Sequence, residues 1–219
     1  MDKSKSYIAF FDLDKTLLSV NSGKILILAA YQKNTLSKLN LAKALFLSLI
    51  FKMEITNNGK IAQYMVKWLK GIEVKELEIL SKQIFETTLK HSIRKSMLDQ
   101  IEYHKRNKAK VVILSAAMDT ICNPIAQLLE FDDVISSKMQ VNDGKFTGKL
   151  QGKLCMEEQK AVLLKGYCNT HNYDYTEAYY YGDSISDKYA LEIVGNPRCV
   201  SPDRRLLKLA KERNWEIIK

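Results

Sequence analysis

The sequence predicts an α/β protein in which helices flank a parallel sheet and a helical segment is inserted after the first strand. Short apolar runs at residues 7–11, 110–114 and 177–181 are typical of buried strands, and polar residues follow each of them. Helical patterns alternate with the later strands, which favours parallel pairing. Residues 24–90 carry helical patterns before any second strand, which indicates a separate subdomain.

The inserted segment is expected to form about four helices, because apolar residues recur there at helical spacing. The apolar positions fall within residues 25–30, 36–50, 61–69 and 77–85. Asn57-Asn58-Gly59 and Gly71 are expected to interrupt the helices, since these residues favour turns.

The rest of the chain predicts strands and helices in alternation, with one hairpin at Asp143-Gly144, a dipeptide that supplies the positive φ angles of a tight turn. In chain order, we expect a helix at 119–129, a strand at 134–136, the hairpin at 141–147, a helix at 157–168, a strand at 198–200 and a helix at 203–213. Ligands of such sheets bind at the carboxyl ends of the strands.

Composition limits the class of protein. The 219 residues, 46% of them hydrophobic, suffice for one sizeable core. The 4 cysteines include no Cys-x-x-Cys, which predicts reduced thiols and a cytoplasmic location. No signal peptide is apparent, and the apolar run at 41–51 is shorter than the roughly 20 residues of a membrane span. The net charge of +9 favours anionic partners, although most lysines are spread as on a solvated surface.

Two carboxylates, Asp12 and Asp14, directly follow the first predicted strand. On an extended backbone they point to one side and Leu13 to the other. Such a pair persists when a cation lies between the acids or one of them is protonated. One carboxylate can then act as a nucleophile while the other moves a proton. An acidic turn after a strand is the simpler alternative.

Polar groups also follow the other predicted strands. Ser115 could hold a phosphate oxygen, or it could be a turn serine. Lys160, early in a helix, suits a phosphate, or it could be an exposed lysine. Asp183 and Asp187 would share one helix face, or Ser184 to Asp187 could only be a capping box.

Taken together, these motifs resemble the haloacid dehalogenase-like (HAD) hydrolase superfamily, in its phosphoserine-phosphatase-like branch, subfamily IB. The matching motifs, in order, are Asp12-Leu13-Asp14-Lys15-Thr16, Ser115, Lys160 and Gly182-Asp183-Ser184-Ile185-Ser186-Asp187. The resemblance implies a Rossmann-like core at residues 1–20 and 91–219 and a helical cap at 21–90.

The resemblance also implies a mechanism. Asp12 would attack phosphorus to form an aspartyl-phosphate, and Asp14 would act as the acid and then as the base. Mg²⁺ would be held by Asp12, by the backbone carbonyl of Asp14 and by Asp183. Phosphoryl oxygens would contact Ser115 and Lys160. In supporting roles, Thr16 would fix the loop and Asp187 would support the metal site.

The expected cap departs from phosphoserine phosphatases. Their glutamate nine residues after the nucleophile, which binds the substrate ammonium, is replaced here by Asn21, and no arginine lies between Met1 and His91. We therefore expect a Mg²⁺-dependent hydrolase acting on a small phosphomonoester other than phosphoserine, with a less polar alcohol preferred.

Three alternatives stay open. They are a phosphoserine phosphatase with a divergent cap, a phosphotransferase, and a basic nucleic-acid- or membrane-binding protein on an inactive HAD scaffold. The inactive scaffold is disfavoured because all the acidic residues of the motifs are present, and clustered carboxylates without a function would cost stability. Nucleic acid is therefore not an expected partner, whereas peripheral membrane contact stays open.

Overall fold

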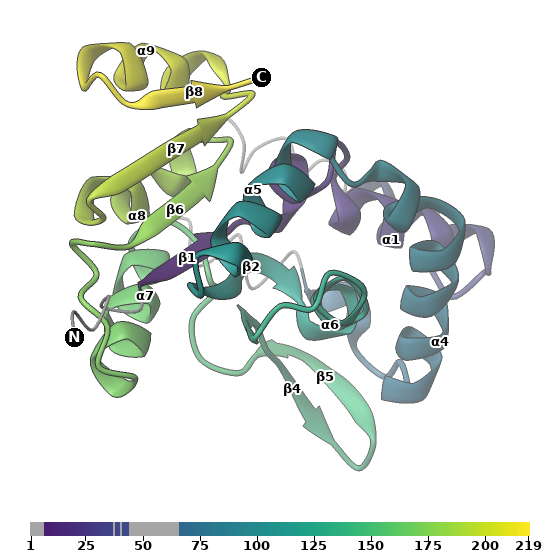
Figure 1. The fold of residues 1–219 in the computed structure, drawn as a ribbon. Coiled ribbons are helices and arrows are strands. Elements are labelled where there is room, and N and C mark those ends of the chain that lie inside the picture. Colours follow the sequence, from purple (N-terminus) through teal and green to yellow (C-terminus); the bar gives the residue numbers. More distant parts are fainter. Residues whose placement is uncertain (1–6, 37, 40, 44–65) are drawn as a thin grey trace.

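The protein is built on a parallel sheet with helices on both faces (Figure 1). The computed structural model describes residues 7–36, 38–39, 41–43 and 66–219. Within them, the strands of the main sheet run in the order β3-β2-β1-β6-β7-β8, and every neighbouring pair is parallel. Their bounds are β1 (Ile8–Phe11), β2 (Lys110–Met118), β3 (Asp133–Ser137), β6 (Tyr179–Gly182), β7 (Asn196–Val200) and β8 (Glu216–Ile218). The predicted α/β class is confirmed.

The two faces of the sheet carry different helices because side chains alternate along each strand. Ile8 and Phe10 of β1 pack in one buried cluster and Ala9 and Phe11 in the other. The first cluster takes in α7 (Glu158–Thr170), α8 (Lys188–Ile193) and α9 (Arg204–Glu212). The second takes in α1 (Ser22–Gln32), α4 (Val74–Ile84), α5 (Lys95–Arg106) and α6 (Asp119–Leu128). Figure 1 shows α7, α8 and α9 on one side of the strands and α1 and α4 far out on the other.

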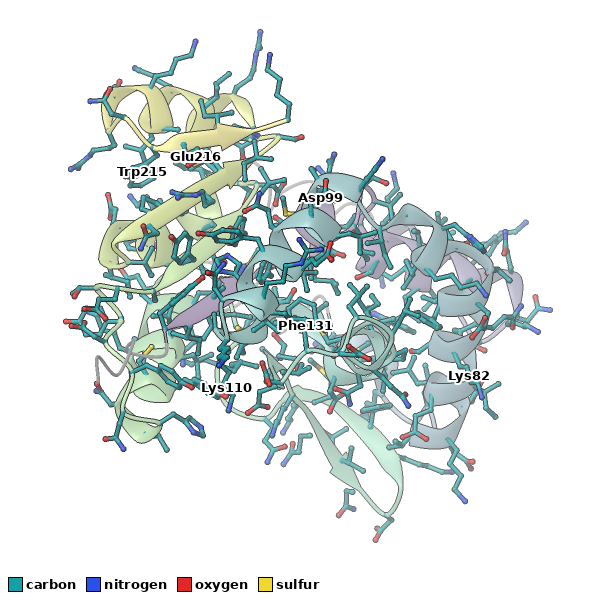
Figure 2. All side chains as sticks on the ribbon, viewed as in Figure 1. Lys82, Asp99, Lys110, Phe131, Trp215 and Glu216 are labelled. Carbon is teal, nitrogen blue, oxygen red and sulfur yellow. The ribbon has the colours of Figure 1, made fainter. Side chains whose placement is uncertain are left out.

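Aromatic packing holds the centre of the second cluster. The ring of Phe131, which follows α6, meets that of Phe11 edge-on with 5.5 Å between centroids, in the middle of the molecule (Figure 2). The Tyr181 ring stacks on the same Phe11 at 4.3 Å. These contacts fix the ends of β1 and β6 against each other, next to the polar residues that follow both strands.

The predicted hairpin is confirmed as the antiparallel pair β4 (Met139–Asn142) and β5 (Lys145–Leu150). It also binds the segment before α4. The Gly71 amide donates to the carbonyl of Phe146, and the Phe146 amide donates to the carbonyl of Ile72. Glu73 and Lys145 form an antiparallel β-bridge.

The ends of the inserted segment meet beside the core. Leu18 and Ile93 form an antiparallel bridge, and the amide of Ser19 donates to the carbonyl of Ser92 at 2.8 Å. The chain therefore leaves the core and returns to it at one place.

Several expectations need correction. Lys67–Leu69 is a 3-10 turn instead of part of a helix, because Gly71 adopts a φ of 86° and the chain pairs with β5 at Gly71 and Ile72. β2 continues three residues past Ser115 to Met118, and Ile185–Asp187 is a 3-10 turn that leads into α8. The expected break at residues 57–59, most of the apolar run at 41–51 and residues 1–6 lie outside the described residues.

The four cysteines are buried and free, as predicted. Among the described residues, none of the helices has the length and apolar character that crossing a membrane requires.

Candidate active site

The site lies where the carboxyl ends of β1, β2 and β6 meet. β1 pairs with both of the other strands, so the residues that follow these strands are brought to one edge of the sheet. Asp12 follows β1, Ser115 lies in β2, and Asp183 follows Gly182 at the end of β6. Lys160 reaches the same place from the first turn of α7.

The loop after β1 is held by its own backbone. The Asp12 amide donates to the carbonyl of Tyr181, and the amide of Leu17 donates back to the Asp12 carbonyl. Lys15 adopts a left-handed φ of 61°. Thr16 is fully buried, and its hydroxyl has no hydrogen-bond partner among the described residues.

Asp14 is tied to the start of α1. Its Oδ1 accepts a hydrogen bond from the Ser22 amide at 2.8 Å. Burial raises the pKa of the Asp14 carboxyl, and hydrogen bonding from Ser22 partly opposes this shift. The raised pKa favours the protonated form of this carboxyl group, which suits a proton donor.

Lys160 is the buried cation of the site. Its Nζ lies 2.7 Å from Oδ1 of Asp12 and 2.6 Å from Oδ1 of Asp187. It also donates to the hydroxyl of Tyr180 at 2.9 Å, and that hydroxyl donates to Asp187 at 2.7 Å. Both carboxylates raise the pKa of the lysine, against the opposing effect of burial, so its ammonium stays charged.

Asp183 adds a third buried carboxylate to the two that bind this ammonium. Ligand oxygens of Asp12, Asp183 and Asp187 all lie within 4.8 Å of one another. Burial and mutual repulsion raise the pKa of Asp12 to about 7 and that of Asp183 to about 8. In the part of the chain that the structure describes, the Asp183 carboxylate has no hydrogen bond or ion pair. The group therefore has an excess of negative charge and an unused oxygen ligand set, which fits a hard divalent cation.

A cavity of about 390 Å³ opens over these groups. The predicted residues that line it are Asp12, Asp14, Asn21, Ser115, Lys160 and Asp183, whereas Thr16 and Asp187 lie outside its lining. Ser115 is buried, and its Oγ accepts from the Ala117 amide at 3.3 Å. Asn21 caps α1, since its Oδ1 accepts from the amide of Lys24 at 2.8 Å.

The segment after β6 forms a capping box and also contributes to the site. Ser184 and Asp187 do form a capping box, with Asp187 Oδ2 accepting from the Ser184 amide at 3.2 Å. The other oxygen of Asp187 binds Lys160 and Tyr180. Asp187 thus joins the turn to the buried cation.

Tyr180 is a site residue that was not predicted from the sequence. Its position in an apolar strand makes it look like a core aromatic, and its ring does lie in the buried cluster. Its hydroxyl could have indicated a role in the site, because a buried tyrosine hydroxyl needs a polar partner and Tyr180 lies only two residues before Gly182.

Comparisons with known proteins agree with this geometry. The haloacid dehalogenase-like hydrolase family matches residues 9–192. A probable phosphatase of Mycobacterium tuberculosis is 28% identical over 213 residues, covering 96% of this chain and 74% of its own length. The inhibition of morphological differentiation protein of Streptomyces azureus is 31% identical over 218 residues, covering 96% and 77%.

The fold has a solved counterpart. A substrate-bound phosphoserine phosphatase superposes with a TM-score of 0.76 over 99% of this chain and 94% of its own, at 18% identity. With a family match over most of its length, this chain belongs to the haloacid dehalogenase-like hydrolase family.

Proposed function

We propose that this HAD-type phosphatase hydrolyses a small phosphomonoester in two steps through an aspartyl-phosphate on Asp12, and that it requires Mg²⁺. The observation that carries the proposal is the group of three buried carboxylates beside one ammonium, in which the Asp183 carboxylate has no partner among the described residues. Such a group is costly in a folded protein unless a cation balances it.

In the first step, an oxygen of Asp12 bonds to phosphorus and the ester oxygen leaves. Lys160, 2.7 Å from Asp12, favours the ionised form of that carboxylate against the effect of burial, and it offers its ammonium to the phosphoryl oxygens. Asp14 gives its proton to the leaving alkoxide. Ser115 lines the same cavity and can donate its hydroxyl to a phosphoryl oxygen.

In the second step, water takes the phosphoryl group from Asp12. Asp14, now ionised, removes a proton from that water, and the Asp12 carboxylate and inorganic phosphate are released. Mg²⁺ would be held by Asp12, the Asp14 backbone carbonyl and Asp183, with Asp187 in support, and when bound it would neutralise charge on the phosphoryl oxygens. Transfer to an acceptor other than water would make the same chemistry a phosphotransferase reaction.

Residues 21–90 would act as the cap, and residues 1–20 and 91–219 as the catalytic core. Supporting this division, residues from both parts line the cavity. We further propose that phosphoserine is a poor substrate. The amide oxygen of Asn21 is already used to cap α1, so it offers no anion for an ammonium. No arginine lines the part of the cavity that described residues form. A cytoplasmic location belongs to the same proposal.

The test is turnover of a small aryl phosphate with Mg²⁺ and after chelation. Asp12→Asn and Asp14→Asn should each lower turnover by at least a hundredfold with the thermal midpoint retained. Asp183→Asn should raise the Mg²⁺ concentration needed for half-maximal activity. Asp99→Asn is the matched control, because Asp99 is an exposed acid on α5 (Figure 2) and does not line the cavity. Full activity after chelation, or near wild-type turnover of Asp12→Asn, would overturn the proposal.

A further inference from the structure

The residues that line the cavity over the acidic group are of two chemical kinds. The charged and polar residues at the strand ends, among them Asp12, Lys160 and Asp183, form what we call the acidic floor. Apolar residues from five separate parts of the chain form what we call the apolar wall. The apolar wall consists of Leu26 and Ile27 of α1; Val66, Trp68 and Leu69 before α4; Met118 and Ile121; Met139; and Leu154 and Met156.

Part of the apolar wall is core, but part of it is not. Leu26, Leu69 and Ile121 are buried against other side chains and complete the core cluster. Ile27, Trp68, Met118, Leu154 and Met156 are only half-buried although they line the cavity. Apolar surface that faces a cavity gains free energy when a ligand displaces water from it. Flexible methionines such as Met118 and Met156 adapt to chains of varied shape.

The described lining lacks an arginine fork for a carboxylate, and of its acids outside the predicted motifs, Glu157 and Asp203, the second is not available to an ammonium. Asp203 is occupied as the cap of α9, since its carboxylate accepts from the amides of Ile185, Arg205 and Leu206. Lys15 and Lys24 add positive charge, which favours the phosphate end of a ligand. A substrate that reaches past the phosphate subsite therefore meets a lining in which apolar side chains predominate.

We propose that the alcohol part of the substrate is an aliphatic chain of several carbons, which lies along the apolar wall while its phosphate lies on the acidic floor. This inference rests on the phosphatase function proposed above and names the substrate class of the same site. The same chemistry occurs in a free alkyl phosphate and in a single-chain lipid phosphate.

The test is kcat/KM for a series of n-alkyl phosphates from ethyl to decyl, kept below their critical micelle concentrations. Each added methylene should raise kcat/KM about two- to fourfold until the cavity is filled, which is the range that burial of one methylene allows. Phosphoserine should fall below butyl phosphate, although the two are of similar size.

Ile27→Asn tests the wall itself. Ile27 is half-buried on the cavity side of α1, so this variant should lower the ratio of octyl to ethyl phosphate kcat/KM at least fivefold. Leu28→Asn is the matched control. Leu28 is the next residue on the same helix, is 38% exposed and does not line the cavity, so the ratio should stay at the wild-type value.

The outcomes separate this inference from the proposed function. If no phosphomonoester is turned over, the proposed function fails. If small aryl phosphates are turned over but kcat/KM is flat along the alkyl series, or phosphoserine leads it, the inference alone is overturned. If a single-chain lipid phosphate in detergent micelles is turned over at a rate equal to that of octyl phosphate, the natural substrate is a lipid. If only octyl phosphate is turned over, the natural substrate is a free metabolite. Both results support an aliphatic chain.

Discussion

The ammonium of Lys160 on α7 lies 2.6 Å from the carboxylate of Asp187 beside β6, and both groups are almost completely buried. Tyr180 bridges the same two groups through its hydroxyl. The position of the lysine in the site therefore depends on side chains that do not line the cavity.

Tyr180→Phe removes this bridge while keeping the ring. It should lower kcat about tenfold and weaken inhibition by inorganic phosphate, because the Lys160 ammonium loses one of its partners. The free energy of unfolding should fall by about 1.5–3 kcal/mol. Tyr181→Phe is the matched control, since its hydroxyl bonds His104 and Gln100 outside the site. It should lose similar stability in urea denaturation but keep its kcat. Equal kcat in the two variants would contradict a positioning role for Tyr180.

Gly182→Ala should displace Asp187. A Cβ at Gly182 would lie 2.8 Å from three atoms of the Asp187 side chain, closer than real Cβ contacts allow. Because Asp187 has to move away, its ion pair with Lys160 should break and turnover should fall at least tenfold. Gly166→Ala in α7 provides the control, since nothing lies within 4 Å of its added methyl group. That change should keep turnover and add up to about 1 kcal/mol of stability. Normal turnover of Gly182→Ala would show that Asp187 is dispensable.

His104 should make stability depend on pH. Burial lowers the pKa of its imidazole from 6.5 to about 4 in the folded protein. Between these values the unfolded chain binds one more proton than the folded one, so the contribution of His104 is complete above pH 6.5 and is lost as the pH falls toward 4. The measurement is the urea-derived free energy of unfolding from pH 4 to 7.5. His104→Gln should reduce its slope in this window. A slope equal in wild type and His104→Gln would refute the assignment.

Glu157 should store backbone strain at the start of α7. Its φ of 50° and ψ of −131° lie in a region that side chains disfavour and glycine accepts. Glu157→Gly should therefore be more stable than Glu157→Ala by about 1 kcal/mol or more. The comparison between the two variants removes the effect of losing the carboxylate. Equal thermal midpoints would mean that the conformation carries no strain.

The sequence predicted the parts of the fold that depend on local pattern. Apolar runs identified β1, β2 and β6, and the residues that follow them lie together at one edge because parallel strands share a direction. The edge strand β8 has three residues and no alternating pattern, so nothing local marked it. α5 was also missed; its mean hydropathy is low, and it is recognised by the few residues, such as Met97 and Ile101, that it buries.

The same limit applies to the site. Residue types and order predicted Asp12, Asp14, Ser115, Lys160 and Asp183 around one cavity. Spacing does not show which of two acids a lysine will meet, and Lys160 pairs with Asp12, 148 positions away, as well as with Asp187. The roles assigned to these residues stay predictions.

The bridge between Leu18 and Ile93 also has a consequence for how such a protein can diversify. With both ends of the insertion fixed at one point on the core, a change in its length alters only a closed loop. Doubling such a loop costs about 0.6 kcal/mol of closure entropy. Both ends of the segment therefore stay at the same point when its length changes, so the residues that it contributes to the cavity can vary between descendants while the acidic group keeps its place.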